Sequence, residues 1–350
     1  MSELRIGIVG CGRVTQQLHL PALQVMEGVS VVALAELEPQ RLARVAGKFG
    51  ITRRYPSHRE LVADELVDVV AVCVPASSHE EVTEAAIKAN KHVFVEKPLA
   101  LEVEQARRMV SLAEATDRKT TVDFNLRSHR LVQDARRIVA GGTLGEIEMV
   151  RTSWTAGFHS EREMSEWYRQ RRYGGGALYD IAVHHADLWR YLLDAEVDTV
   201  YARSRSDLFE DQSAAITATM SNGALVSGAY SKRTSASHDI EIYGQRAALA
   251  FSCYRVDSLE VRPVSQAAGG LNVRLRGLME KTRTLPATLA VGIRGGDYIR
   301  SYARHWGRFL HSIRVGAQPP SSFRDGLEAL RVIGAAVESI ETGSAVELSR

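Results

Sequence analysis

The sequence has only three cysteines, Cys11, Cys73 and Cys253, and they lie far apart in the chain. None belongs to a CxxC pair, so the sequence offers neither a disulfide framework nor the ligand spacing of a structural zinc site. This cysteine usage is typical of a reducing compartment, and we expect a cytoplasmic protein.

Long hydrophobic runs are also missing. No run of about 18 or more apolar residues occurs, although 45% of the residues are hydrophobic. The chain begins directly with a predicted strand, without the charged and apolar regions of a signal peptide. We therefore expect no association with a membrane.

An excess of charge of one sign is absent as well, since the formal net charge at pH 7 is only +2. Two basic clusters, residues 169–172 and 274–283, are more typical of solvated faces or anion contacts than of a nucleic-acid groove. No nucleic-acid partner is expected.

The chain of 350 residues is long enough for two globular domains with a sizeable core.

A glycine turn follows the first apolar run, residues 6–9. Gly10-Cys-Gly12 lies between this predicted strand and a segment that can form a helix. Glycines let the backbone approach a pyrophosphate without a Cβ in the way, and a helix N-terminus offers free N–H groups. The same pair can also close an ordinary turn. Thr15 replaces the third glycine of the dinucleotide-binding fingerprint, so it could separate helix and strand slightly, or offer its hydroxyl to the pyrophosphate.

An acidic residue, Glu36, ends the second predicted strand, residues 29–35. A carboxylate at this position can accept both ribose hydroxyls of an adenosine and repels a 2′-phosphate, which favours NAD over NADP. The alternative is that Glu36 merely precedes the next helix, whose first turn contains Pro39 and favours acidic side chains.

Strands and helices alternate through the first third of the chain, which predicts βαβ crossovers and a doubly wound parallel sheet. We therefore predict a Rossmann domain over residues 1–125. The elements predicted after the second strand are 67–74, 77–89, 91–95, 103–115 and 120–124. Ligands of such sheets bind beyond the carboxyl ends of the strands. The residues at these ends are Gly10, Glu36, Pro75, Glu96, Lys97 and Asn125.

Glu96-Lys97-Pro98 follows the strand predicted at residues 91–95. A lysine at the mouth of the sheet, beside the predicted cofactor, could hydrogen-bond a substrate hydroxyl and lower its pKa. A surface Glu–Lys pair of little energetic consequence is the alternative, and the spacing alone favours it.

The densest chemical stretch opens with three glycines, residues 174–176, before a predicted helix. On that helix Asp180, His184 and Asp187 are spaced to share one face. His184 and Asp187 could simply bond to each other. Asp180, His184 and His185 could hold a metal, although adjacent histidines point about 100° apart on a helix. The third alternative is acid/base chemistry by Asp180 and His184, to which the pKa of histidine is suited.

The second domain, residues 126–350, contains short β-rich segments, and Asn222-Gly223 is a hairpin signal. Such strands predict a mostly antiparallel sheet with helices on one face. The predicted strands are 147–154, 197–203, 213–220, 224–230, 238–243, 247–251 and 258–264, and the predicted helices are 130–140, 298–313 and 323–341. Residues 267–296 lack clean periodicity and could be a lid, a substrate loop or an oligomer arm.

Two motifs in this order resemble a known family. Gly10-x-Gly12 with Glu96-Lys97-Pro98 and the stretch at 123–127, Asp-Phe-Asn-Leu-Arg, resembles the Gfo/Idh/MocA family of oxidoreductases. The pattern Gly-Gly-Gly-x-Leu-x-Asp180-x-x-x-His184-x-x-Asp187 is similar to its second signature. The resemblance implies a Rossmann domain followed by an α/β domain with a large open sheet. It also implies that the peptide bond before Pro98 can be cis, and that the open sheet face packs against a second subunit in a homodimer or homotetramer.

The same resemblance implies an NAD(P)-dependent oxidoreductase whose active site combines Lys97, Asp180 and His184. We predict hydride transfer between NAD, in preference to NADP, and a secondary hydroxyl or ketone of a sugar, amino sugar or cyclitol. An NAD-dependent glycosidase with transient redox chemistry and a non-catalytic NAD-sensing protein are the alternatives. No metal site is predicted. The predicted cofactor contacts are Gly10, Cys11, Gly12, Arg13, Val14, Glu36, Val74, Pro75, His79, Glu96, Lys97, Asn125, Trp167 and Arg171.

Overall fold

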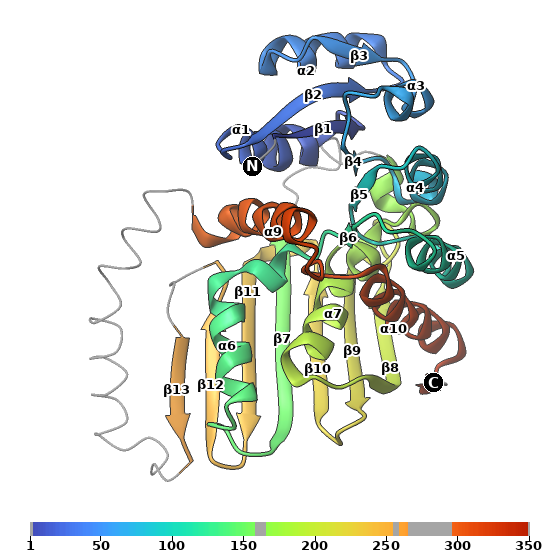
Figure 1. Cartoon of the computed structure of the whole chain (residues 1–350). Helices are drawn as coiled ribbons and strands as arrows, with labels where there is room; N and C mark the ends of the chain where they lie inside the picture. Colours follow the sequence, from blue (N-terminus) through green and yellow to red (C-terminus); the bar gives the residue numbers. More distant parts are fainter. Residues whose placement is uncertain (1–2, 158–165, 255–258, 265–295, 349–350) are drawn as a thin grey trace. The chain divides into compact units, whose positions relative to one another are not determined.

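The computed structural model describes residues 3–157, 166–254, 259–264 and 296–348, and the chain divides into two compact units (Figure 1). The first unit contains Met1–Ser128 and Ser301–Leu330, and the second contains His129–Arg300 and Arg331–Arg350. The division predicted after residue 125 differs, because residues 301–330 pack with the first unit. The segment predicted as a lid or arm, residues 267–296, lies outside the described residues except for its last position.

A six-stranded parallel sheet forms the centre of the first unit, with strand order β3-β2-β1-β4-β5-β6. This is the order of a doubly wound dinucleotide-binding fold, so the predicted fold class is confirmed for this unit. Its central strands are continuous runs of buried apolar residues because helices cover both faces. The strands are β1 Leu4–Val9, β2 Val29–Ala35, β3 Arg53–Tyr55, β4 Val69–Val72, β5 His92–Val95 and β6 Thr120–Val122.

The helices of the first unit follow the predicted alternation. They are η1 Thr15–His19, α1 Leu20–Gln24, α2 Pro39–Phe49, α3 His58–Ala63, η2 Ala76–Ser78, α4 His79–Lys88, α5 Val103–Glu114 and η3 Asn125–Ser128. Strand β3 and helix α3 were not predicted. The three residues of β3 include two arginines and carry no strand pattern. The helix after the glycine turn contains a π-helical turn, η1, a feature that is frequent at functional sites.

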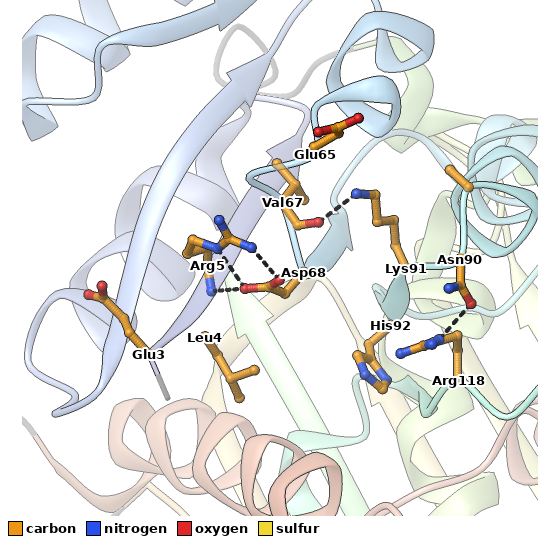
Figure 2. A pocket seen from close by; sticks show the side chains of 11 residues that line it. Glu3, Leu4, Arg5, Glu65, Val67, Asp68, Asn90, Lys91, His92 and Arg118 are labelled. Carbon is orange, nitrogen blue, oxygen red and sulfur yellow. Dashed lines mark hydrogen bonds and ion pairs between the residues drawn. The ribbon is translucent and has the colours of Figure 1, made fainter. Parts of the chain in front are cut away.

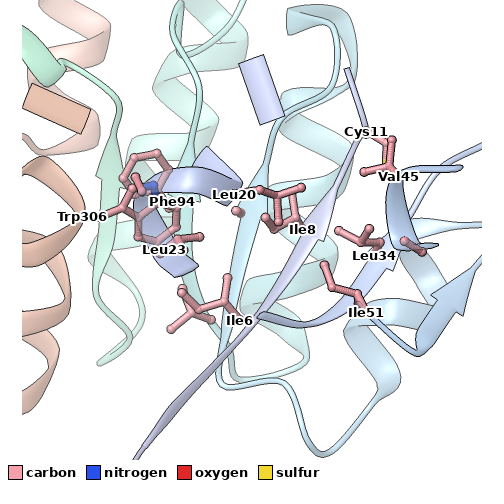
Figure 3. Close-up of a cluster of buried hydrophobic side chains, with 14 of the residues drawn as sticks. Ile6, Ile8, Cys11, Leu20, Leu23, Leu34, Val45, Ile51, Phe94 and Trp306 are labelled. Carbon is pink, nitrogen blue, oxygen red and sulfur yellow. The ribbon is translucent and has the colours of Figure 1, made fainter. Parts of the chain in front are cut away.

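The core of the first unit explains why residues 301–330 belong to it. Trp306, on α9 Gly296–Val315, stacks on Phe94 of β5 with ring centroids 3.8 Å apart (Figure 3). Both side chains are fully buried among Ile6, Leu20 and Leu23. A distant helix thus completes the core of the dinucleotide-binding sheet, which local periodicity does not reveal.

An eight-stranded sheet dominates the second unit, with order β13-β12-β11-β7-β10-β9-β8-β14. Its pairs are antiparallel except β7 with β10, so the predicted mostly antiparallel sheet is confirmed. The strands are β7 Ile147–Gly157, β8 Val197–Arg205, β9 Ser213–Met220, β10 Leu225–Ser231, β11 Arg233–Gly244, β12 Ala247–Ser252, β13 Leu259–Pro263 and β14 Val346–Glu347.

Helices α6 Arg130–Ala140 and α7 Val183–Leu193 lie on one face of this sheet (Figure 1). Three short turns, η5 Glu166–Arg169, η6 Arg171–Tyr173 and the π-helical η7 Leu178–Ala182, precede α7. The last helix, α10 Phe323–Thr342, contributes residues to both units. None of the helices in the described part of the chain has the length and hydrophobicity that a membrane span requires.

Candidate functional site

The glycine turn after β1 has the shape that a pyrophosphate requires. Gly10 adopts φ +98°, and a Cβ there would lie 2.3 Å from the carbonyl oxygen of Cys73, so only glycine fits. A Cβ on Gly12 would meet no protein atom within 4 Å. The backbone at Gly12 is therefore open to a ligand, and Arg13 and Val14 are exposed beside it. These residues fit a bound dinucleotide.

Thr15 forms a hydrogen bond across the protein side of this turn. Its hydroxyl donates to the Gly10 carbonyl at 2.7 Å, and its side chain is fully buried. The hydroxyl is thus engaged in the protein, which contradicts the suggestion that it serves the pyrophosphate. Cys11 is buried as well, and burial, followed by the charge of Glu36, raises the pKa of its thiol to about 12. Only the backbone of Cys11 can therefore contribute to cofactor binding.

Glu36 reaches the glycine turn although 25 residues separate it from Cys11. Glu36 Oε2 accepts the Cys11 N–H at 3.0 Å, and Oε1 accepts the Glu38 N–H at 3.1 Å. Arg41 lies 3.5 Å from the same carboxylate. An acid fixed beside the second glycine is what recognition of an adenosine ribose needs.

His79 connects two loops at the carboxyl ends of β4 and β5. Its Nδ1 lies 2.9 Å from the Pro98 carbonyl and its Nε2 lies 3.0 Å from the Val74 carbonyl, and the ring is almost completely buried. Burial lowers the pKa of His79, although the carbonyls that face both ring nitrogens act in the opposite direction. His79 is 1% exposed and joins the loop of Lys97 to the end of β4, and its direct cofactor contact stays a prediction. The Lys97–Pro98 bond is cis, as the resemblance implied.

Two other predicted contacts also lie at these strand ends. Pro75 is exposed after β4, whereas Asn125 is fully buried and donates to Ser301 Oγ at 2.7 Å. The amide of Asn125 thus links the end of β6 to α9 within the first unit.

Glu96 belongs to a buried network that sequence reasoning missed. The Trp306 N–H donates to Nδ1 of His19 at 3.0 Å, so the proton of a neutral His19 ring lies on Nε2. Nε2 donates to Glu96 Oε1 at 2.7 Å, and Glu96 Oε2 accepts the Lys97 backbone N–H at 3.2 Å. The carboxylate of Glu96 thereby fixes the backbone of Lys97.

Asp123, at the end of β6, adds a second acid to this network. Its carboxyl is 1% exposed, and one oxygen lies 3.9 Å from His19 Nε2. Burial, followed by the charge of the neighbouring Glu96, raises the pKa of Asp123 well above its usual value. Although His19, Glu96 and Asp123 lie close enough to share a metal, His19 Nε2 carries a proton and has no lone pair for one.

Replacement of Asp123 by asparagine should change how stability depends on pH. In the wild type the folded pKa is raised, so its contribution is complete below about pH 4 and falls as pH rises. An asparagine does not titrate, so this loss of stability with rising pH is absent from the variant. The melting temperature of Asp123→Asn should therefore exceed that of the wild type increasingly from pH 4 to pH 8. Exposed Asp117→Asn is the control, and parallel melting curves for wild type and Asp123→Asn would contradict the assignment.

Asp180, in the second unit, lies on the π-helical turn η7. The Tyr168 hydroxyl and the Lys232 ammonium both donate to its Oδ2. Lys232 Nζ also lies 3.5 Å from the centroid of the Tyr168 ring. Neither partner was predicted, and their only signal in the sequence is a lysine at the end of a strand pattern.

His184 is the second residue of α7, two positions after the end of η7, and is 2% exposed. Its ring is tilted against that of Trp154, with centroids 5.3 Å apart. Because η7 is π-helical, the α-helical spacing that predicted one shared face does not hold between Asp180 and His184. Both residues nevertheless lie in the same unit and within one helical segment.

The suggested metal set of Asp180, His184 and His185 does not form. His185 Nε2 lies 3.0 Å from His238 Nε2, and burial lowers the pKa of His185 to about 3. Among the described residues, only His19, Glu96 and Asp123 come within metal-ligating reach of one another, so this alternative is wrong.

Arg171 and Trp167 were predicted to contact the cofactor. The Arg171 guanidinium binds the buried Asp211 through two hydrogen bonds of 2.9 and 3.0 Å, and Glu341 at 3.1 Å. Arg171 is thus held by carboxylates of the second unit, and its cofactor contact stays a prediction. Trp167 is 40% exposed and stays a prediction.

A cavity of about 570 Å³ lies at the amino ends of β1, β4 and β5 (Figure 2). In its lining, Arg5 binds Asp68 at 2.9 and 2.8 Å and Lys91 donates to the Val67 carbonyl at 2.7 Å. Doubly wound sheets bind cofactors at the opposite, carboxyl edge. We therefore do not place the functional site in this cavity.

The chain matches models of one protein family over both parts. Residues 4–124 match the model described as an oxidoreductase family with an NAD-binding Rossmann fold (GFO_IDH_MocA). Residues 132–250 match the GFO/IDH/MocA C-terminal domain. The family resemblance and the NAD-binding fold predicted from the sequence are thus confirmed.

Curated relatives match over almost the whole length. Myo-inositol 2-dehydrogenase of Thermotoga maritima is 27% identical over 99% of this chain and 98% of its own. An uncharacterized oxidoreductase, ORF334, of Rhizobium meliloti is 28% identical over 98% and 99%. The solved structure of the WlbA dehydrogenase from Bordetella pertussis, in complex with NADH and UDP-GlcNAcA, has a TM-score of 0.85. It is 21% identical and covers 100% of this chain and 99% of its own, which shows the same fold.

Proposed function

Because the chain belongs to the Gfo/Idh/MocA oxidoreductase family, we propose that it is an NAD-dependent dehydrogenase of a sugar or cyclitol. The reaction converts a secondary hydroxyl into a ketone, or the reverse. The observation that carries this proposal is the bond from the Cys11 N–H to Glu36, which fixes an acid beside an open glycine turn. A relative acting on myo-inositol and a similar fold bound to a nucleotide sugar support the substrate class.

The residues around the turn would hold the cofactor. The backbone of Gly12 leaves room for the pyrophosphate, and Glu36 would accept the ribose hydroxyls. The charge of Glu36 disfavours a 2′-phosphate, so NAD is preferred over NADP. When bound, NAD supplies the hydride acceptor, which is the step that side chains cannot provide.

Three side chains would perform the proton chemistry on the substrate. His184 takes the proton of the hydroxyl group as the C–H bond gives up its hydride. The Lys97 ammonium stabilises the alkoxide charge that develops on the oxygen. Asp180 orients the substrate or His184 and keeps its own charge through Lys232 and Tyr168. The products are a ketone, NADH and one proton.

We further propose that copies of the chain associate through the face of the eight-stranded sheet that α6 and α7 leave uncovered, as a homodimer or homotetramer. Met149 and Leu225 are paired across β7 and β10 on this face and are 41% and 56% exposed. Exposed apolar side chains on a sheet face favour association. Sedimentation velocity tests this, since a monomer would contradict it. We also propose a cytoplasmic location, because the sequence has only three cysteines and no CxxC pair.

A panel of sugars, amino sugars and cyclitols, each incubated with NAD or NADP, tests the proposed function. We expect NADH formation with at least one polyol, and faster reduction of NAD than of NADP. Glycoside cleavage without net NADH would instead support the glycosidase alternative. Cofactor binding without turnover of any compound would favour a sensor.

A further inference from the structure

We propose that Lys232 is a positioning residue of this enzyme, which holds the Asp180 carboxylate through a buried ion pair. The inference rests on the proposed function, because it explains how Asp180 is prepared for the role given to it there. Lys232 itself is 1% exposed, so a substrate can be influenced by it only through Asp180.

The contact joins two segments that are far apart in sequence. Lys232 lies between β10 and β11, and Asp180 lies on η7, 52 residues earlier. The backbone N–H of Lys232 donates to the Gln212 carbonyl at 2.9 Å, so its backbone is fixed at the end of the strand. A lysine anchored in this way can hold a carboxylate in one orientation.

The energetics of burial indicate that the ion pair has a purpose other than stability. An ammonium group that leaves water loses its hydration and is retained in a core only when it is paired. A buried ion pair is often no more stabilising than apolar side chains of similar volume. The 18% exposure of the Asp180 side chain, against 1% for Lys232, leaves the carboxylate as the accessible member of the pair.

Tyr168 completes the arrangement. Its ring lies beneath the Lys232 ammonium at 3.5 Å, which is the geometry of a cation–π contact. Its hydroxyl donates to the same oxygen of Asp180 that Lys232 binds. Two donors on Oδ2 restrict rotation of the carboxylate and favour its ionised form. Because the two donors stabilise the charged form, the Asp180 carboxylate is a weak base, which leaves proton removal to His184.

Kinetics of Lys232 variants test the inference with a substrate found in the panel. We expect Lys232→Met to lower kcat by about 100-fold, the usual cost of a misplaced catalytic group. The affinity for NADH, followed by its fluorescence, should be unchanged. Lys91→Met is the control, since Lys91 is partly buried and donates to two carbonyls in the first unit. It should keep the kcat of the wild type.

The double variant Asp180→Asn/Lys232→Met separates a positioning role from a general loss of packing. If Lys232 acts through Asp180, the second substitution should lower kcat less than about twofold beyond Asp180→Asn alone. A further 100-fold loss, or full activity of Lys232→Met, would overturn the inference. Lys232→Arg, which keeps the cation, should retain much of the wild-type kcat and tests the inference even if Lys232→Met does not fold, because a folded Lys232→Arg with a kcat as low as that of Asp180→Asn would overturn it. Full activity of Asp180→Asn and His184→Ala would instead overturn the proposed function itself.

Discussion

Replacement of Lys97 by methionine is expected to lower kcat by about 10²- to 10⁴-fold, the range of a proton-transfer or charge-stabilising group. Methionine keeps the length of the side chain but removes the ammonium that would stabilise the alkoxide. The same loss is expected for His184→Ala, since no other group is proposed to take the hydroxyl proton. The measurement is steady-state formation of NADH with a substrate from the panel.

The cofactor site should survive the Lys97 substitution. Glu96, which binds the Lys97 backbone, is held by a hydrogen bond from His19 that the substitution leaves in place. Titration with NADH should therefore give the wild-type affinity for Lys97→Met. Lys88→Met, at a lysine whose side chain is 70% exposed, is the control for loss of one positive charge. Wild-type turnover in Lys97→Met or His184→Ala would show that the proposed catalytic roles are wrong.

Alanine at Gly10 should lower stability, whereas alanine at Gly12 should lower the affinity for NAD. Gly10→Ala would place a Cβ 2.3 Å from the Cys73 carbonyl oxygen at φ +98°, so it should lower the melting temperature by about 10 °C. Gly12→Ala meets no protein atom within 4 Å and should leave the melting temperature within about 2 °C. Its methyl group would instead occupy the space proposed for the pyrophosphate, and NAD affinity should fall tenfold or more, about 1.4 kcal/mol.

Thermal unfolding and NADH titration of both variants measure these effects. Each variant serves as the control of the other, because both add the same methyl group to the same turn. Wild-type NAD affinity in a folded Gly12→Ala would contradict the placement of the cofactor at this turn.

Much of the fold could be predicted because its periodicity is local. The strand at 29–35, the strand at 213–220 and the helix at 130–140 have the predicted boundaries. Each combines a clear apolar period with a recognisable end. The parallel pairing of β7 with β10 was not predicted, because pairing partners depend on the crossover between them and not on either strand alone.

For the candidate site, too, the sequence reveals the motif residues but not the buried residues that contact them. Motif spacing identified Glu36 and the glycine turn, and the structure joins them by a hydrogen bond. The buried partners of the motif residues, Lys232 for Asp180 and Asp123 for Glu96, could not be found, because only tertiary packing brings them together. His79 and Arg171, which were assigned to the cofactor, also bind carbonyls and carboxylates that the sequence did not reveal. Polar side chains near strand ends can equally satisfy carbonyls or carboxylates of the protein itself.

The central claim is that hydride passes from a carbinol carbon of a sugar or cyclitol to NAD. The most direct test uses a substrate from the panel that carries deuterium on the oxidised carbon. Mass spectrometry of the nicotinamide product should show one deuterium per reduced cofactor formed, with loss of product formation in His184→Ala. Reduced cofactor without deuterium, or substrate turnover without any reduced cofactor, would contradict the claim.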